Sequence, residues 1–272
     1  REIAFCCSGY NGGQTQTGLD ILDVTDPNNI IELDRVFYSN PAYSHQGWLS
    51  EDRQYFYLGD ELDEGPLPTT TKVINVSNLT NAFEQTTFTN GNIAVGHNLY
   101  TKNGYCYQAN YRSGLRIFDL NQSATNPPEV AYFDTFPTND SATFNGLWNV
   151  FPYFSSGTVI GSDIESGLFV WRFAQPPVAF EFPGGLPEYL DPAGVTINVN
   201  LTETGAGSLA AGSETLNYDS GSGWQTAPLN NLGNGAYLAN IPPLPCGAST
   251  QWFVSVEDSA GVVWASQNGT PF

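Results

Sequence analysis

Four copies of one short strand pattern decide the fold of this chain: Gly18-Leu-Asp-Ile-Leu-Asp-Val24, Thr70-Thr-Lys-Val-Ile-Asn-Val76, Gly114-Leu-Arg-Ile-Phe-Asp-Leu120 and Gly167-Leu-Phe-Val-Trp-Arg-Phe173. Their starts lie 52, 44 and 53 residues apart. Repeats of this length, each built from short strands, are typical of the blades of a β-propeller. We call these four segments the blade signatures.

Each of the last three blade signatures is preceded by two further strand patterns joined by a tight turn. In the second repeat these are residues 46–49 and 54–58, and in the third they are residues 98–100 and 105–108. A fourth strand follows the signature, for example at residues 129–133. We therefore predict four antiparallel strands per blade. The first blade lacks its innermost strand in this chain, and the fourth stops after its third strand.

The composition changes after the fourth signature. A Pro-rich segment starts near residue 174, and residues 195–201, 252–256 and 262–264 then read as strands of a small domain. The sequence predicts an all-β fold with two parts: four propeller blades, part of a larger propeller, and an immunoglobulin- or fibronectin-like sandwich. The predicted boundaries are 1–173 for the blades, 174–187 for a linker and 188–272 for the sandwich.

The net charge of −19 limits the classes of partner. Only eight residues are Lys or Arg, and none of them follows position 172. Such a chain is not expected to bind nucleic acid or anionic lipid, because both need basic residues to neutralise phosphates. No apolar run is long enough for membrane insertion of this chain. An acidic surface favours an extracellular or cell-surface protein that attracts divalent cations.

The blade signatures resemble the LVIVD repeat, and a wider set of segments resembles the choice-of-anchor B family of exported bacterial proteins. The segments that carry this resemblance include Ser44-His-Gln-Gly-Trp-Leu49, Gly96-His-Asn-Leu-Tyr100 and Ser162-Asp-Ile-Glu-Ser-Gly-Leu168. The resemblance covers residues 1–173 and implies a propeller with further blades upstream, export, and attachment to the cell surface. The second part resembles sandwich modules of planctomycete exported proteins. The family lends no established catalytic activity.

Equivalent positions of the blades carry polar side chains. His45, His97 and Asn145 start the innermost strands, and Asp60, Asn110 and Asp163 end the next strands, with Glu61 close by. Because adjacent strands run antiparallel, these positions share one edge of the sheet. We take these seven residues as a candidate ligand-binding site on the propeller face. His45, Asp60, His97 and Asp163 are its candidate metal ligands, for calcium or another divalent ion as cofactor. In the alternative interpretation, each pair is a hydrogen bond that fixes the turn of its blade.

The leading functional hypothesis is a non-enzymatic binding or scaffold protein that acts through the propeller face on an unknown protein or a surface polysaccharide. A metal-dependent hydrolase or lyase with its site among the His, Asp and Asn residues is the alternative. A structural subunit of an extracellular assembly is the second alternative. In that case the N-terminal strand pairs by its edge with another chain.

Overall fold

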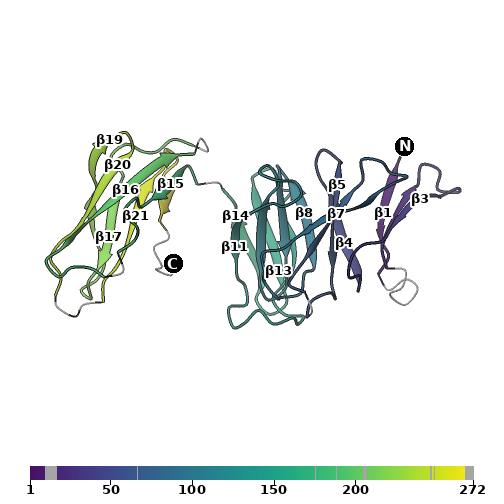
Figure 1. The fold of residues 1–272 in the computed structure, drawn as a ribbon, viewed down its shortest axis with the longest axis horizontal. Helices are drawn as coiled ribbons and strands as arrows, with labels where there is room; N and C mark the ends of the chain where they lie inside the picture. The colour runs from purple at the N-terminus through teal and green to yellow at the C-terminus, as the bar shows by residue number, and fades with distance from the viewer. Residues whose placement is uncertain are drawn as a thin grey trace. The chain divides into compact units, whose positions relative to one another are not determined.

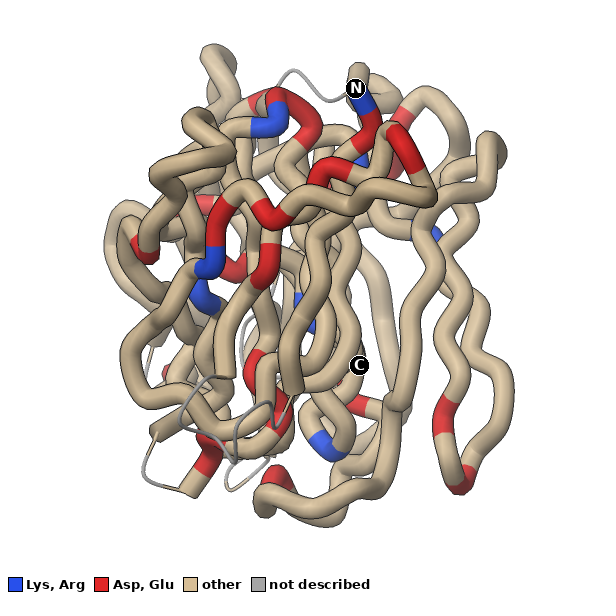
Figure 2. Tube along the Cα trace, turned by 90° about the vertical axis from the view of Figure 1, so that its right-hand side faces the viewer, with Lys and Arg blue, Asp and Glu red and all other residues tan. Residues whose placement is uncertain are grey.

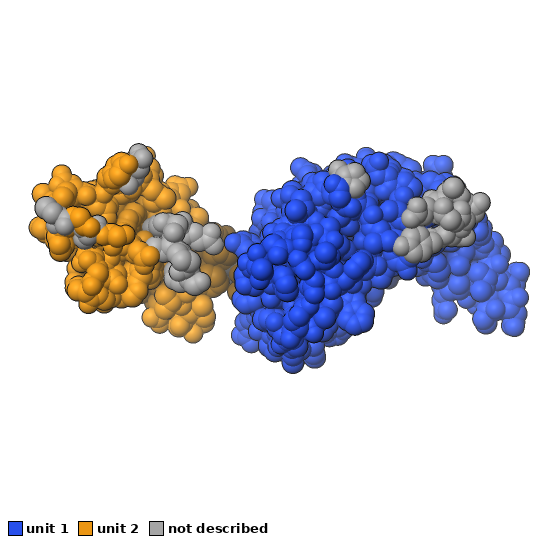
Figure 3. Space-filling view, turned by 90° about the horizontal axis from the view of Figure 1, so that it is seen from below, with its two compact units in different colours: residues 1–173 blue, residues 174–272 orange. Residues whose placement is uncertain are grey.

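The computed structural model describes residues 1–9, 17–65, 67–174, 176–187, 189–204, 207–245, 247 and 249–266. All regular elements in these residues are β-strands, and none is a helix that could span a membrane (Figure 1). The chain forms two compact units, Arg1–Phe173 and Ala174–Phe272, which Figure 3 colours separately. Each unit is described by itself below.

The first unit consists of four antiparallel sheets that follow one another along the chain, and in each sheet every strand pairs with its neighbour in sequence. The first sheet contains β1 (Ile3–Cys7), β2 (Leu19–Asp23) and β3 (Ile31–Val36). The second contains β4 (Ser44–Leu49), β5 (Tyr55–Asp60), β6 (Thr71–Asn75) and β7 (Phe83–Phe88). The third contains β8 (Asn98–Lys102), β9 (Tyr105–Ala109), β10 (Leu115–Asp119) and β11 (Glu129–Phe133). The fourth contains β12 (Leu147–Phe151), β13 (Thr158–Asp163) and β14 (Gly167–Arg172).

These sheets are the predicted blades. The blade signatures supply β2, β6, β10 and β14, which are equivalent strands in the four sheets. Four strands are present in the second and third blades, and three in the described residues of the first and fourth, as the sequence predicts. The innermost strands β4, β8 and β12 lie next to one another. The all-β prediction is thus confirmed for the first unit.

The blades are held together by apolar side chains that alternate along each strand. In the second blade, Phe56, Leu58 and Ile74 pack against Leu19 and Ile21 of the first. The intervening Tyr57 and Val73 point the other way, toward the third blade, and join Leu99, Cys106 and Phe118. The third blade buries Leu115 and Ile117 against Leu147, Val150 and Val159 of the fourth. Both faces of a middle blade are therefore buried, which strand alternation makes possible.

Two tryptophans of the innermost strands are not part of these cores. We expected Trp48 and Trp148 to pack inside, because they occupy equivalent blade positions. That expectation is wrong: 42% of Trp48 and 55% of Trp148 is exposed. Trp48 instead lies against Tyr100, with ring centroids 5.0 Å apart. An innermost strand has a hydrogen-bonded neighbour on one edge only, so its side chains are less covered than those of β5 or β6.

The second unit is a sandwich of two four-stranded antiparallel sheets. One sheet has the order β15-β16-β20-β19 and the other β18-β17-β21-β22. Their bounds are β15 (Val178–Glu181), β16 (Val195–Glu203), β17 (Thr215–Asp219), β18 (Gln225–Pro228), β19 (Asn230–Gly233), β20 (Ala236–Ile241), β21 (Gln251–Glu257) and β22 (Val263–Ala265). Val199 and Ala239 of one sheet share a buried core with Leu216 and Val254 of the other. The sandwich prediction is confirmed.

The segment predicted as a linker contains part of this sandwich. Strand β15 lies inside residues 174–187 and pairs with β16, from Val178 opposite Glu203 to Glu181 opposite Asn200. Val178 is buried in the sandwich core, and Phe180 packs against that core. The Pro-rich composition indicated a linker, but the four residues after Pro177 supply enough apolar surface to form an edge strand.

The thiols of the described residues are free. The sequence leaves buried free thiols and one disulfide as alternatives for its four cysteines. Cys6 is exposed, Cys7 is half-buried and Cys106 is fully buried, so among the described cysteines only Cys106 is a buried thiol. Burial raises the pKa of Cys106 to about 12, which keeps this thiol protonated and unreactive. Cys246 lies outside the described residues.

The packing between the first and second blades can be tested with Ile74, whose side chain is fully buried. We expect Ile74→Ala to lower the free energy of unfolding by about 2–5 kcal/mol, because it leaves a cavity between the two blades. Ile30→Ala is the matched control, since Ile30 is 57% exposed. Urea unfolding followed by circular dichroism measures both changes, and equal losses in the two variants would contradict this packing.

Candidate metal centre

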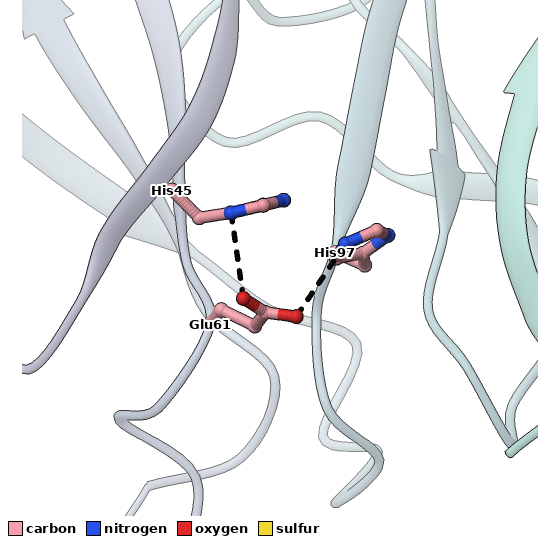
Figure 4. Close-up of side chains that lie close together, drawn as sticks. All are labelled: His45, Glu61 and His97. Carbon is pink, nitrogen blue, oxygen red and sulfur yellow. Dashed lines mark ion pairs between the residues drawn. The ribbon is translucent and has the colours of Figure 1, made fainter. Parts of the chain in front are cut away.

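Three side chains of the predicted site lie together at one edge of the second and third blades: His45, Glu61 and His97 (Figure 4). His45 is the second residue of β4, Glu61 follows the last residue of β5, and His97 precedes the first residue of β8. Because β4 and β8 are adjacent innermost strands, the starts of these strands bring the two imidazoles side by side.

A β-bulge directs His45 into this site. The pairing of β4 with β5 shifts between Ser44, which lies opposite Asp60, and Gln46, which lies opposite Gly59. His45 is therefore the extra residue, and its side chain is re-aimed relative to a regular strand. The neighbouring backbone is fixed by a hydrogen bond from the Glu61 N–H to the Tyr43 carbonyl at 2.9 Å.

The carboxylate of Glu61 lies within reach of both imidazoles. Its Oε2 is 3.4 Å from Nδ1 of His45, and its Oε1 is 3.4 Å from Nε2 of His97. The two rings stack with centroids 4.4 Å apart and planes 20° apart. All three ligand atoms lie within 4.8 Å of one another. In the part of the chain that the structure describes, this is the one such group of His, Cys, Asp or Glu residues.

His97 is oriented by Trp148. Its Nδ1 lies 2.5 Å from the Trp148 carbonyl oxygen, which can only accept a hydrogen bond, so Nδ1 carries the proton. The lone pair on Nε2 then accepts a bond from the Trp148 indole N–H at 3.1 Å. Burial lowers the pKa of His97 to about 4, so this ring is neutral at neutral pH. A neutral imidazole whose Nδ1–H is held by a backbone carbonyl is the usual form of a metal-binding histidine.

Tyr111 supports the carboxylate. Its hydroxyl donates a hydrogen bond to Oε1 of Glu61 at 3.1 Å, and its ring packs against His97 with centroids 4.7 Å apart. Burial and the neighbouring Glu61 raise the pKa of Tyr111, so the phenol keeps its proton and remains a donor. Such a contact orients a ligating carboxylate from outside the coordination sphere.

This donor set has a clear chemical preference. Two imidazole nitrogens and one carboxylate suit zinc and other late divalent metals, whereas calcium prefers oxygen ligands alone. Three protein ligands leave at least one coordination position open in a tetrahedral site. The group therefore fits a transition metal with an accessible position better than it fits calcium.

Asp60, a predicted metal ligand, is used differently. Its carboxylate is buried and accepts four hydrogen bonds, from the Tyr38 hydroxyl and from the N–H groups of Ala42, Tyr43 and Leu62, at 2.7–3.1 Å. These donors come from the preceding loop and from the turn after β5. Asp60 thus fixes the backbone on either side of His45 and Glu61, and it lies outside the group of three ligand atoms.

Asp163 and Asn110 also serve the turns of their own blades. Oδ1 of Asp163 accepts hydrogen bonds from the N–H groups of Glu165 and Ser166 at 3.0 and 2.8 Å. Asn110 donates through Nδ2 to Gln108, and its backbone N–H and C=O bond to Gly114 and Ser113. Asp163 also lies outside the group of ligand atoms.

Asn145 belongs to a network of charged side chains in the third and fourth blades. It accepts a hydrogen bond from Nη2 of Arg112 at 2.6 Å and donates one to Oε1 of Glu165 at 2.5 Å. His45, His97 and Asn145 therefore occupy equivalent positions in sequence but have different interactions in the structure. One pair of blades assembles the His45–Glu61–His97 group, and the fourth blade contributes only Trp148.

The acidic run Asp60-Glu61-Leu62-Asp63-Glu64 is not the solvated loop that its composition indicates. Asp60 and Asp63 are buried and Glu64 is half-buried. Burial raises the pKa of Asp63 to about 6, against the lowering effect of Lys72. Burial also raises the pKa of Glu64 to about 8, although the Gly96 N–H donates to its Oε1 at 2.7 Å. Asp and Glu outnumber Lys and Arg by 27 to eight in the chain. Figure 2 marks the acidic and basic positions along the backbone.

Comparison with known proteins gives distant likenesses in structure. No protein-family model matches the sequence, and no curated protein matches it, so the resemblance to LVIVD repeats and to the choice-of-anchor B family stays a prediction.

Three solved structures illustrate these likenesses. A protein of unknown function from Desulfotomaculum acetoxidans is 11% identical with a TM-score of 0.45, over 62% of this chain and 53% of its own length. A Lactobacillus plantarum protein is 14% identical with a TM-score of 0.48, over 92% and 71%. The periplasmic gluconolactonase of Pseudomonas aeruginosa is 13% identical with a TM-score of 0.42, over 97% and 81%. The chain spans about half of the Desulfotomaculum protein.

The structural role of Asp60 can be separated from metal binding. We expect Asp60→Asn to lower the free energy of unfolding by about 2 kcal/mol, because an amide cannot accept all the hydrogen bonds that this buried carboxylate accepts. Asp26→Asn is the control, since Asp26 is exposed and its Oδ1 accepts one backbone hydrogen bond, from Asn28. Denaturant unfolding of both variants gives the comparison; unchanged stability of Asp60→Asn would refute the structural role.

Proposed function

We propose that this chain is an exported binding protein that holds a divalent transition-metal ion at the propeller face and binds its partner there. The observation that carries the proposal is the convergence of His45, Glu61 and His97, with all ligand atoms within 4.8 Å. The chain contains only two histidines, and both belong to this group. Zinc is the ion that we propose for this site, because two imidazoles and one carboxylate are a common set of zinc ligands.

Several properties of the surroundings support a cation at this position. Neutral His97 adds no positive charge to the group, so it does not balance the charge of the Glu61 carboxylate. The net charge of −19 raises the local concentration of cations at the surface. His45 and Glu61 are half-buried, which leaves a route for the ion and for a ligand.

The partner that we propose is a surface polysaccharide or a protein that offers an oxygen donor to the metal. Trp48, Trp148 and Tyr153 place exposed aromatic surface on or just after the innermost strands. Such rings stack on sugars or on apolar side chains, and the metal would fix the polar end of the ligand. An extracellular or cell-surface location agrees with the acidic composition and is part of the proposal.

A metal-dependent hydrolase is the second candidate. It is favoured by the number of protein ligands, because three ligands and an open position for water are typical of catalytic zinc sites, including His₂Glu sites. The zinc-loaded protein would then hydrolyse model esters or phosphoesters. Hydrolysis by the zinc-loaded protein that is absent from the metal-free protein and from His45→Ala would favour this candidate over binding alone.

The edge of β1 is the observation behind a structural role. β1 is the end strand of its sheet, so β2 is its one strand partner in the described residues. Just after β1, an isolated bridge joins Gly9 to Ser44 of β4. A second chain adding a strand to this edge would make the protein a subunit of an assembly. Sedimentation of the purified chain over a range of concentrations tests this candidate.

The metal site is tested by titrating the metal-free protein with zinc in a calorimeter. We expect one ion per chain, and we expect His45→Ala, His97→Ala and Glu61→Gln each to weaken binding at least about tenfold through loss of a ligand. Glu203→Gln is the control for charge, because Glu203 is exposed and lies in the second unit. Equal affinity of Glu61→Gln and Glu203→Gln would contradict the site.

Metal binding should also move Trp148. Its indole N–H now occupies the Nε2 lone pair of His97, which a metal would need. We expect zinc to change tryptophan fluorescence, and we expect Trp148→Phe to bind zinc more tightly, because no hydrogen bond has to be broken. Trp224→Phe is the control, since Trp224 lies in the second unit. A zinc-dependent signal that persists in Trp148→Phe would argue against this displacement.

A further inference from the structure

A buried lysine lies against a buried aspartate in the second blade. Lys72 is the second residue of β6, and Asp63 lies in the loop that leads from β5 to β6. Nζ of Lys72 is 2.8 Å from Oδ2 of Asp63, and the two side chains are only 1% and 2% exposed. Neither oxygen of Asp63 has a partner with hydrogen-bond geometry, so the close contact is an ion pair with unfavourable angles.

The equivalent positions in the neighbouring blades show how unusual this pair is. The third position of the blade signature is Asp20 in the first blade and Arg116 in the third. These residues pair with Arg35 and Glu129, and in both pairs the side chains are 10–25% exposed. Both of those pairs use arginine, whose guanidinium remains protonated and is not a nucleophile. Only the second blade combines lysine with complete burial of both partners.

The surroundings of the pair exclude water. Lys72 lies opposite Leu58 in the strand pairing and shares a strand face with Ile74, and both of these residues are fully buried. The ring centroid of Tyr38 is 5.8 Å from Nζ. An ion pair in such an environment has a large desolvation cost that further hydrogen bonds must offset. The orphaned oxygens of Asp63 leave that cost without full compensation.

We propose that Lys72 and Asp63 condense to an intramolecular amide bond within the folded second blade. The bond from Nζ to Cγ forms, and one bond from Cγ to Oδ breaks. The released oxygen leaves as water with two of the three protons of the ammonium group, and the third remains on the amide nitrogen. The +1 and −1 charges disappear together, so the step is balanced and needs no other reactant.

The product suits the site better than the reactants do. A neutral amide replaces two buried charges, and the exclusion of water protects it from hydrolysis. The amide would also close the loop of residues 63–72, which removes freedom from the unfolded chain much as a disulfide does. None of this depends on a bound metal.

Mass spectrometry tests the proposal directly on the full chain. After folding and overnight storage at neutral pH, we expect the denatured protein to be lighter than its sequence mass by about 18 Da, one water molecule. Trypsin should fail to cut after Lys72 and yield a peptide of residues 54–102 with this deficit. Cleavage after glutamates should leave residues 62–64 attached to residues 65–84.

Two variants decide the origin of the deficit. Lys72→Arg keeps the positive charge but not the nucleophile, so it should have the full sequence mass, whereas the control Lys102→Arg should keep the deficit. A deficit that remains in Lys72→Arg would come from another dehydration and would overturn the proposal. A folded wild-type chain at full mass that is cut normally after Lys72 would also overturn it. Circular dichroism confirms that each variant is folded.

Discussion

The first unit depends on one constraint: a blade between two others must bury both of its faces. In the second blade, successive side chains of a strand point to opposite faces of the sheet, so Phe56 and Leu58 pack toward the first blade and Tyr57 packs toward the third. A shift in pairing by one residue would turn each side chain to the opposite face, so the register is strongly specified. This register sets Ser44 opposite Asp60 and leaves His45 as the extra residue of the bulge. The position of the candidate metal centre thus follows from core packing.

Much of this architecture is predictable because its signals are local and repeated. The blade signatures combine apolar alternation with turns rich in Asn, Asp and Pro, and the structure places a strand at each signature. Solvent exposure on the innermost strands was not predictable, because equivalent positions do not reveal what covers them. Trp48 and Trp148 illustrate this limit, since they repeat in sequence yet remain largely exposed. The start of the sandwich differs from the prediction for a related reason, because composition alone does not show that Val178 is buried.

In the candidate site, the repeat pattern predicts the two histidines but not which acidic residue contacts them. His45 and His97 were identified because they occupy equivalent positions at the starts of adjacent inner strands. The repeat pattern also predicts Asp60 and Asp163 as ligands, since they end the next strands, but a short Asp side chain there accepts hydrogen bonds from the N–H groups of its own turn. Glu61 is one residue further along and one methylene longer, so it extends past the turn to both imidazoles. That difference of one position and one carbon cannot be derived from the repeat pattern.

The electrostatics of the site favour a cation over an anion, which narrows the chemistry that it can perform. His97 is held neutral by burial, and its Nδ1–H is already committed to the Trp148 carbonyl. What remains directed toward the centre is the lone pair of Nε2 and a carboxylate that lies close to both rings. Lone pairs and carboxylate oxygens repel an anion, but each is a donor to a metal ion. The Trp148 indole N–H donates a hydrogen bond to Nε2 of His97, and the Tyr111 hydroxyl donates one to Oε1 of Glu61. A metal ion is a stronger Lewis acid than either donor. It would replace the indole N–H at Nε2, and it would share the carboxylate with Tyr111.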